Sequence, residues 1–127
     1  MINIGAEITR TYTSAELTEG RTPSVGTVYC APDGKEYKFV SYDVGAGSVA
    51  AVAGNVAYYG VDGYKSGVVT SDLSDSVETG AGVLQSAPAD GEFCWVQIRG
   101  AATLNLALTA GADGAILTPT GATDGTL

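Results

Sequence analysis

The chain has 127 residues, 18 of them glycine, and a formal net charge of −8 from 14 acidic and 6 basic side chains. This length corresponds to one domain, which can bury a core without disulfide staples. The acidic balance argues against a protein that wraps nucleic acid or lies on an anionic membrane, because both attract a basic surface. Because glycine is costly inside helices and useful in tight turns, we expect a turn-rich β protein.

The first 23 residues are predicted to form an N-terminal arm ahead of a single β domain over residues 24–127. The isoleucines Ile2, Ile4 and Ile8 alternate loosely, and a polar stretch follows them. Thr13-Ser-Ala-Glu is a capping-box sequence, which predicts one helical turn. Two interpretations stay open: the arm orders against a partner, or it is an edge strand or frayed terminus of its own domain.

Residues 27–31 and 36–42 are predicted to form a β-hairpin. The intervening Pro32-Asp-Gly-Lys is a turn sequence, since proline presets φ and glycine accepts the left-handed conformation. Alternation along the return strand places Phe39 and Val40 on opposite faces.

A tyrosine- and glycine-rich region follows. A short strand is predicted at residues 49–52 and another at 56–61. Tyr58, Tyr59 and Tyr64 are predicted to form an interface, because tyrosine supplies contact area at low entropic cost. The alternative is that these rings cap the end of their own barrel.

An acidic segment spans residues 71–78. Asp72, Asp75 and Glu78 are spaced by three, so on a helical turn they would share a face and could bind calcium or act as paired carboxylates. The EF-hand pattern is missing, and runs of charge are usually solvated. We therefore interpret the segment as a solvated acidic loop, and Gly80-Ala-Gly after it as a bulge or close backbone approach.

The core is predicted to grow around residues 92–99, which alternate with a period of two and include the only tryptophan. Further short strands are predicted at residues 67–70 and 115–118, and residues 125–127 resemble the start of a strand that pairs on another subunit or frays. About eight or nine short strands joined by Gly, Asp and Pro predict an all-β sandwich or barrel. The predicted core anchors are Phe39, Phe93, Trp95, Val96 and Ile98.

The sequence offers little catalytic chemistry. The chain has no histidine, which excludes Ser-His-Asp and Cys-His catalysis and histidine-bound zinc. Cys30 and Cys94 are interpreted as two buried, reduced thiols, with a disulfide as the alternative. The first residues show no secretory signal, so we expect a protein that is made in the cytoplasm. We predict no enzyme, no catalytic residue, no cofactor and no metal.

Two runs of the sequence stand out as motifs: Gly26-Thr-Val-Tyr-Cys-Ala-Pro-Asp-Gly-Lys-Glu-Tyr-Lys-Phe-Val and Gly82-Val-Leu-Gln-Ser-Ala-Pro-Ala-Asp-Gly-Glu-Phe-Cys-Trp-Val-Gln-Ile-Arg-Gly. Both resemble short motifs of decoration, or cement, proteins of tailed-bacteriophage heads. The closing Thr118-Pro-Thr-Gly-Ala-Thr-Asp-Gly-Thr-Leu fits the end of the same pattern. Cys94 departs from it, since the family usually has glycine there.

The resemblance implies a β-fold on the outer surface of the virion capsid, bridging subunits of the major capsid protein as a homo-oligomer, a trimer rather than a dimer. The acidic net charge, independently of the resemblance, predicts no nucleic-acid and no membrane partner. We expect truncation of residues 1–22 to weaken head binding without unfolding the domain. The alternative is a carbohydrate-binding or adhesin module of a virion fibre or cell surface, since Tyr and Trp stack on sugar rings. The predicted contact residues are Ile2, Ile4, Ile8, Arg10, Tyr12, Tyr58, Tyr59 and Tyr64.

Overall fold

The computed structural model describes residues 7–61, 67–108, 115–119 and 123–127. Tyr64 and the isoleucines Ile2 and Ile4 therefore lie outside the described residues. The elements are α1 (Ser14–Thr18), β1 (Val28–Cys30), β2 (Glu36–Tyr42), β3 (Val56–Gly60), β4 (Val68–Thr70), the 3₁₀ turn η2 (Leu73–Asp75), β5 (Ser76–Leu84) and β6 (Phe93–Arg99). The predicted all-β class is confirmed. In the described part of the chain, no helix is long and apolar enough to cross a membrane.

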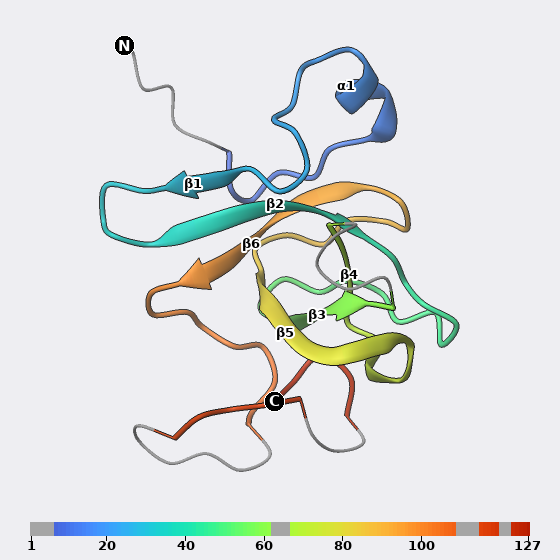
Figure 1. The fold of residues 1–127 in the computed structure, drawn as a ribbon, viewed down its shortest axis with the longest axis vertical. Coiled ribbons are helices and arrows are strands. Elements are labelled where there is room, and N and C mark those ends of the chain that lie inside the picture. Colours follow the sequence, from blue (N-terminus) through green and yellow to red (C-terminus); the bar gives the residue numbers. More distant parts are fainter. Residues whose placement is uncertain (1–6, 62–66, 109–114, 120–122) are drawn as a thin grey trace.

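Five strands close into a small barrel. Neighbours pair in the order β2, β4, β3, β5, β6, and β6 pairs back onto β2 (Figure 1). The β2–β4 pair is parallel, whereas the other pairs are antiparallel. β1 is an extra strand outside the barrel. It pairs with the first three residues of β2, whereas Ser41 and Tyr42 at the end of β2 pair with β4.

The predicted hairpin is confirmed as β1 and β2. At its turn Gly34 has φ +87°, and the Lys35 amide donates to the Asp33 carboxylate at 3.0 Å. The Ala31 amide closes the turn by donating to the Lys35 carbonyl at 2.8 Å. Local sequence therefore sets the hairpin register.

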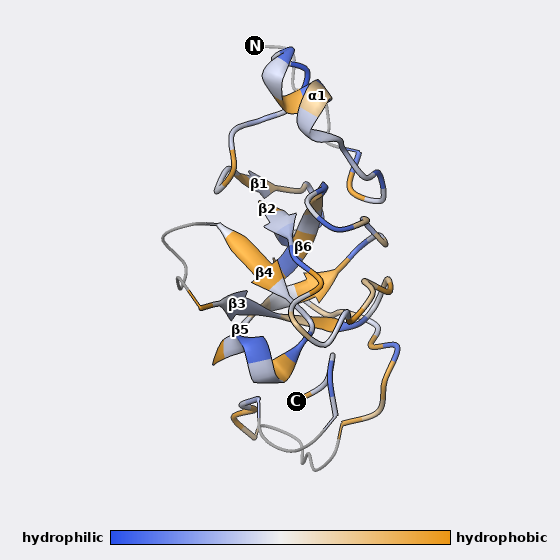
Figure 2. Ribbon diagram, turned by 90° about the vertical axis from the view of Figure 1, so that its right-hand side faces the viewer, coloured by the Kyte–Doolittle hydropathy of each residue, from blue (hydrophilic) through white to orange (hydrophobic). Residues whose placement is uncertain are grey.

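Small and β-branched side chains fill the inside of the barrel. Alanines at three positions leave room for the one large interior ring, Tyr42, whose hydroxyl donates to the Val49 carbonyl at 2.7 Å. Figure 2 shows the hydrophobic residues gathered in the barrel strands, most clearly in β4. The buried members of this interior cluster are Val40, Tyr42, Ala51, Ala57, Val69, Ala81, Leu84, Cys94 and Val96.

A second cluster lies on the outer face of β2 and β6. Its centre is Phe39, whose ring centroid lies 5.2 Å from that of Trp95 and 5.9 Å from that of Phe93. Both faces of β6 are therefore buried, which confirms the alternation predicted for residues 92–99. We name this the outer aromatic cluster; its buried members are Tyr12, Tyr37, Phe39, Phe93 and Trp95.

One predicted core anchor is wrong. Ile98 follows Val96 along the same face of β6, but it lies where the ladder to β2 becomes irregular, between Glu36 and Tyr37. There the barrel no longer covers it, and Ile98 is 40% exposed.

The described part of the N-terminal arm packs on its own barrel. Tyr12 and Phe93 exchange two backbone hydrogen bonds of 2.9 and 2.8 Å. The capping box of Thr13 and Glu16 is present and starts α1, as predicted. Leu17 then packs against the outer aromatic cluster. The described residues of the arm pack on their own domain, but they do so through a single isolated β-bridge at Tyr12 and not as the edge strand named in one of the two interpretations.

The C-terminal residues cover the opposite side of the barrel. The Val56 amide donates to the Gly125 carbonyl at 2.8 Å, and the Leu73 amide donates to Asp124 Oδ1 at 2.9 Å. Residues 123–127 therefore lie along β3 of their own chain. The strands predicted at 49–52 and 115–118 do not form, because those residues join no ladder of the sheet. Figure 1 shows α1 and the C-terminal segment at opposite ends of the molecule.

Candidate interaction surfaces

Asp72, the first carboxylate of the acidic segment, is built into the fold and is not solvated. Asp72 is 2% exposed, and its Oδ2 accepts from the Gly47 amide at 2.7 Å. Its Oδ1 accepts from the amide of Ser74 at 3.1 Å and from the hydroxyl of Ser74 at 2.6 Å. The hydrogen bond from the Ser74 side chain, followed by that from Gly47, lowers the pKa of Asp72. The predicted solvated loop is therefore wrong for this residue.

The neighbouring carboxylates have different surroundings. Asp75 Oδ2 accepts from the Ala46 amide at 2.8 Å, so Asp72 and Asp75 together hold the 45–47 loop. Glu78 is exposed in β5, on a backbone with φ +54°. Within the described ranges, no group of three or more acidic or cysteine side chains could hold a metal ion. The calcium site, the alternative to a solvated loop, is therefore not assembled by the described residues.

The two cysteines are free and have different environments. Cys94 is fully buried inside the barrel, and burial raises its pKa to about 12. Cys30 is exposed on β1, with its Sγ 3.6 Å from Glu36 Oε1. The prediction of two buried thiols is wrong for Cys30, because β1 lies outside the closed barrel. The disulfide alternative fails as well.

The predicted tyrosine face is not formed by Tyr58 and Tyr59. As consecutive strand residues they point to opposite sides of β3. Tyr58 is fully buried, and its hydroxyl donates to the Thr126 carbonyl beneath the C-terminal segment. Tyr59 packs against the interior cluster, with Lys38 Nζ 5.1 Å from its ring centroid. The interface prediction is therefore wrong for Tyr58, which is covered by its own chain.

The described contact residues of the arm divide into a buried and an exposed set. Ile8 packs against the outer aromatic cluster, and Tyr12 is one of its buried members. Arg10 lies over the Tyr12 ring at 4.8 Å and pairs with Glu16 at 2.7 Å. Arg21 pairs with Glu19 at 3.0 Å on the exposed side. The outer surface of the arm is therefore charged, with both signs present.

The edge of the sheet at β1 is a second candidate surface. Among the described residues β1 pairs only with β2, and Val28 is 48% exposed. An unpaired strand edge is a template for another chain. β1 and α1 lie at the same end of the molecule (Figures 1 and 2).

A polar groove of about 520 Å³ lies on the outer side of β5 and β6. Sequence reasoning missed it, because its wall comes from residues 101–105, which form no regular element. The only local signal was Gln97, a carboxamide inside an apolar strand. We name this the amide groove; its polar lining residues are Lys35, Tyr37, Gln85, Gln97, Thr103 and Asn105.

The described residues define a small closed β-barrel with terminal segments packed on two sides. No family model matches the chain, and no curated protein or solved structure was found that matches it. We therefore infer the function from the chain's own residues and their arrangement.

Proposed function

We propose that this chain is a structural virion protein that decorates a bacteriophage capsid from the outside and stabilises it by bridging major capsid protein subunits. The observation that carries this proposal is the pairing of the two motif runs, 26–40 and 82–100. They are distant in sequence but lie side by side as β2 and β6, with Phe39 opposite Trp95 and Val40 opposite Cys94. The family-like residues thus build one structural unit, the sheet between the two cores.

The Cys94 departure is compatible with that unit. Its side chain points into the barrel and is fully buried among apolar neighbours. A buried free thiol behaves as a small hydrophobic group, so cysteine adds packing where the family pattern has glycine.

We assign the capsid and subunit contacts to the end of the molecule that carries α1 and β1. The charged outer side of the arm offers ion pairs, and the free edge of β1 offers backbone hydrogen bonds to an added strand. A net charge of −8 favours solubility of the free protein. A homo-oligomer, a trimer rather than a dimer, would present several copies of this end, so weak contacts add through multivalency.

Binding of this protein would stabilise the capsid shell by mass action. A protein that binds the assembled shell and not its dissociated subunits shifts the equilibrium towards the shell. This role needs no reaction and no cofactor.

The alternative of a carbohydrate-binding or adhesin module that stacks sugars on aromatic rings is less well supported. Trp95 is 3% exposed, Tyr58 is fully buried and Tyr37 is 8% exposed. Their faces are packed in the cores, so they offer no stacking platform.

The test is cosedimentation of the purified chain with expanded heads assembled from the major capsid protein of the same genome. We expect saturable binding, heads that melt at a higher temperature, and protection of Cys30 from a maleimide reagent on the heads. Cys94 is buried, so the maleimide reaction measures the accessibility of Cys30 alone. Absence of cosedimentation together with an unchanged head melting temperature would refute the proposal.

The arm is tested by removing residues 1–6 alone. A larger truncation to residue 22 also removes Tyr12 and uncovers the outer aromatic cluster, so loss of binding would then report on folding. The short truncation keeps Ile8 and Tyr12. We expect it to weaken head binding while the melting temperature of the free protein stays unchanged.

A further inference from the structure

The amide groove presents oriented polar groups that the fold itself does not use. Gln97 is 6% exposed, and its Nε2 donates to the Arg99 carbonyl at 3.1 Å and to the Ala101 carbonyl at 2.9 Å. Both N–H groups of the amide are therefore engaged, and Oε1 has no donor within the described part of the chain. A buried carboxamide fixed in this way is a preorganised acceptor.

Two further carboxamides line the groove, the half-buried Gln85 and the exposed Asn105, and each donates one hydrogen bond. Gln85 Nε2 donates to the Val83 carbonyl at 3.0 Å, and Asn105 Nδ2 donates to Asn55 Oδ1 at 2.9 Å. Their side-chain oxygens, like that of Gln97, accept no hydrogen bond from any residue that the structure describes. The groove is thus lined by three carboxamides, and an amide oxygen accepts hydrogen bonds from hydroxyl groups.

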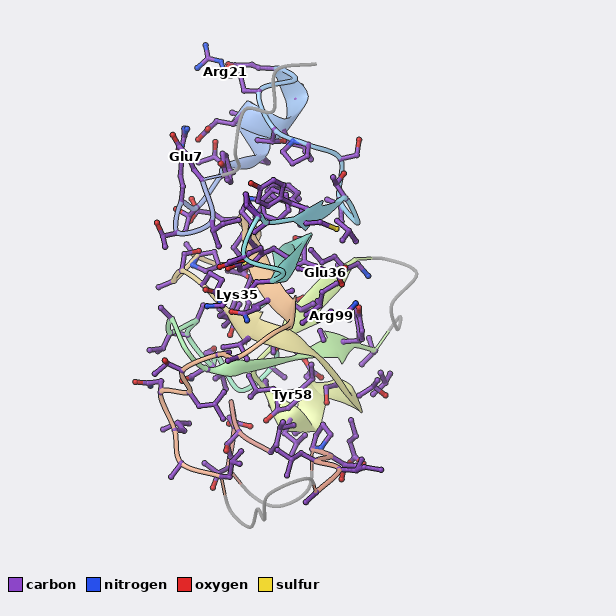
Figure 3. The ribbon with its side chains drawn as sticks, turned by 90° about the vertical axis from the view of Figure 1, so that its left-hand side faces the viewer. Glu7, Arg21, Lys35, Glu36, Tyr58 and Arg99 are labelled. Atoms are coloured by element: carbon purple, nitrogen blue, oxygen red, sulfur yellow. The ribbon has the colours of Figure 1, made fainter. Side chains whose placement is uncertain are left out.

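Donors come from the β2 side of the groove. The Lys35 ammonium and the Tyr37 hydroxyl line it, and neither has a partner among the described residues. Figure 3 shows Lys35 near the chain that leaves β6, and Arg21 at the far end of the molecule. Lys35 is the only charged side chain of the described lining, so it is the group that can pair with an anionic group on a ligand.

The backbone around the groove is already paired. β6 pairs with β2 at Tyr37–Gln97 and with β5 at Val83–Gln97, so its Gln97 position offers no free ladder edge to an extended peptide. A ligand is therefore recognised by side chains, through hydroxyl donors on the ligand and one anionic group.

We propose that the amide groove binds a short acidic saccharide, with its carboxylate at Lys35 and its hydroxyls on the oxygens of Gln85, Gln97 and Asn105. This mode uses hydrogen bonds and not ring stacking, so the burial of the aromatic rings does not oppose it. The proposal does not rest on capsid binding, because the groove residues are not among the capsid contacts that we assign to α1 and the free edge of β1.

The test is a titration of the ¹⁵N-labelled full chain, followed by amide chemical shifts, with α-1,4-digalacturonate and with α-1,4-galactobiose as its uncharged counterpart. We expect digalacturonate to shift the amides of residues 97 and 101–105 with a Kd on the order of 1 mM, and galactobiose to bind more weakly. Lys35→Gln should weaken digalacturonate binding about fivefold or more, since a charge-assisted hydrogen bond is lost. Arg21→Gln, which removes an equal charge far from the groove, should leave the affinity for digalacturonate unchanged.

Three results would overturn the proposal. They are no shift with either sugar, shifts confined to residues outside the groove, or equal digalacturonate affinity in Lys35→Gln and the unmodified chain. Tricarballylate, which carries carboxylates without ring hydroxyls, tests the saccharide part. If it shifted the same amides with equal affinity, the groove would be a general anion site. Head cosedimentation stays unaffected in each case, so failure here is distinguishable from failure of the capsid role.

Discussion

Replacing Tyr12 with alanine should destabilise the whole domain, although Tyr12 lies in a segment predicted to be an arm. The ring is 7% exposed and meets Phe39 edge to face, with centroids 5.5 Å apart. Truncation of a buried aromatic ring costs about 3–5 kcal/mol, and we take the lower end because a terminal segment can relax into the space. For a domain of this size, a loss of about 3 kcal/mol lowers the melting temperature by about 10 °C.

The matched control is Tyr12→Phe. The Tyr12 hydroxyl makes no hydrogen bond within the described part of the chain, so this variant should melt within about 2 °C of the unmodified protein. Calorimetry gives the melting temperatures, and trypsin cleavage at Arg10 and Arg21 reports whether the segment has left the barrel. If Tyr12→Ala melted like the control and the segment stayed resistant to trypsin, the arm would not be part of the cooperative fold.

Three further predictions concern the barrel. Cys30 should react with a thiol reagent in the native protein, whereas Cys94, with a pKa raised to about 12 by burial, should react only after unfolding. Asp72→Asn should destabilise the protein at pH 7 by about 1–3 kcal/mol, because an amide N–H would face the donors that the carboxylate accepts. Folding lowers the pKa of Asp72, so the ionised carboxylate stabilises the protein above about pH 4. This stabilisation is lost as the pH falls through the pKa of Asp72 in the folded protein. The free energies of unfolding in urea should therefore become similar for Asp72→Asn and the unmodified protein at acidic pH. Gly82→Ala places a Cβ 2.6 Å from the Gln97 carbonyl oxygen and should lower the free energy of unfolding by about 2 kcal/mol or more in the same assay. The control is Gly80→Ala, whose Cβ would meet no atom within 4 Å; it should change the free energy of unfolding by less than about 0.5 kcal/mol.

Local sequence determined the elements whose causes are local. The turn at Gly34 and the capping box at Thr13 need only neighbouring residues, and both form as predicted. The period of two in residues 92–99 also predicted that Phe93 and Cys94 would face opposite sides. That pattern could not say that both sides are buried, because the cover on each side comes from distant parts of the chain.

The contact predictions failed wherever burial depended on such distant segments. Tyr58 has the composition of an interface residue, but residues 123–127 cover it. Cys30 and Cys94 have similar apolar neighbours in sequence, and only the position of β1 outside the barrel makes one exposed. The amide groove depends on a non-repetitive segment, residues 101–105, which has no sequence period to recognise.

The sequence by itself determined an acidic, histidine-free, turn-rich β domain, its central hairpin and the alternating strand that carries its tryptophan. Only the tertiary structure decided that β6 pairs back onto β2, which closes the barrel and divides the apolar residues into an interior cluster and an outer aromatic cluster. The physical reason is that alternation along a strand is a local steric property, whereas closure is a register between segments more than fifty residues apart.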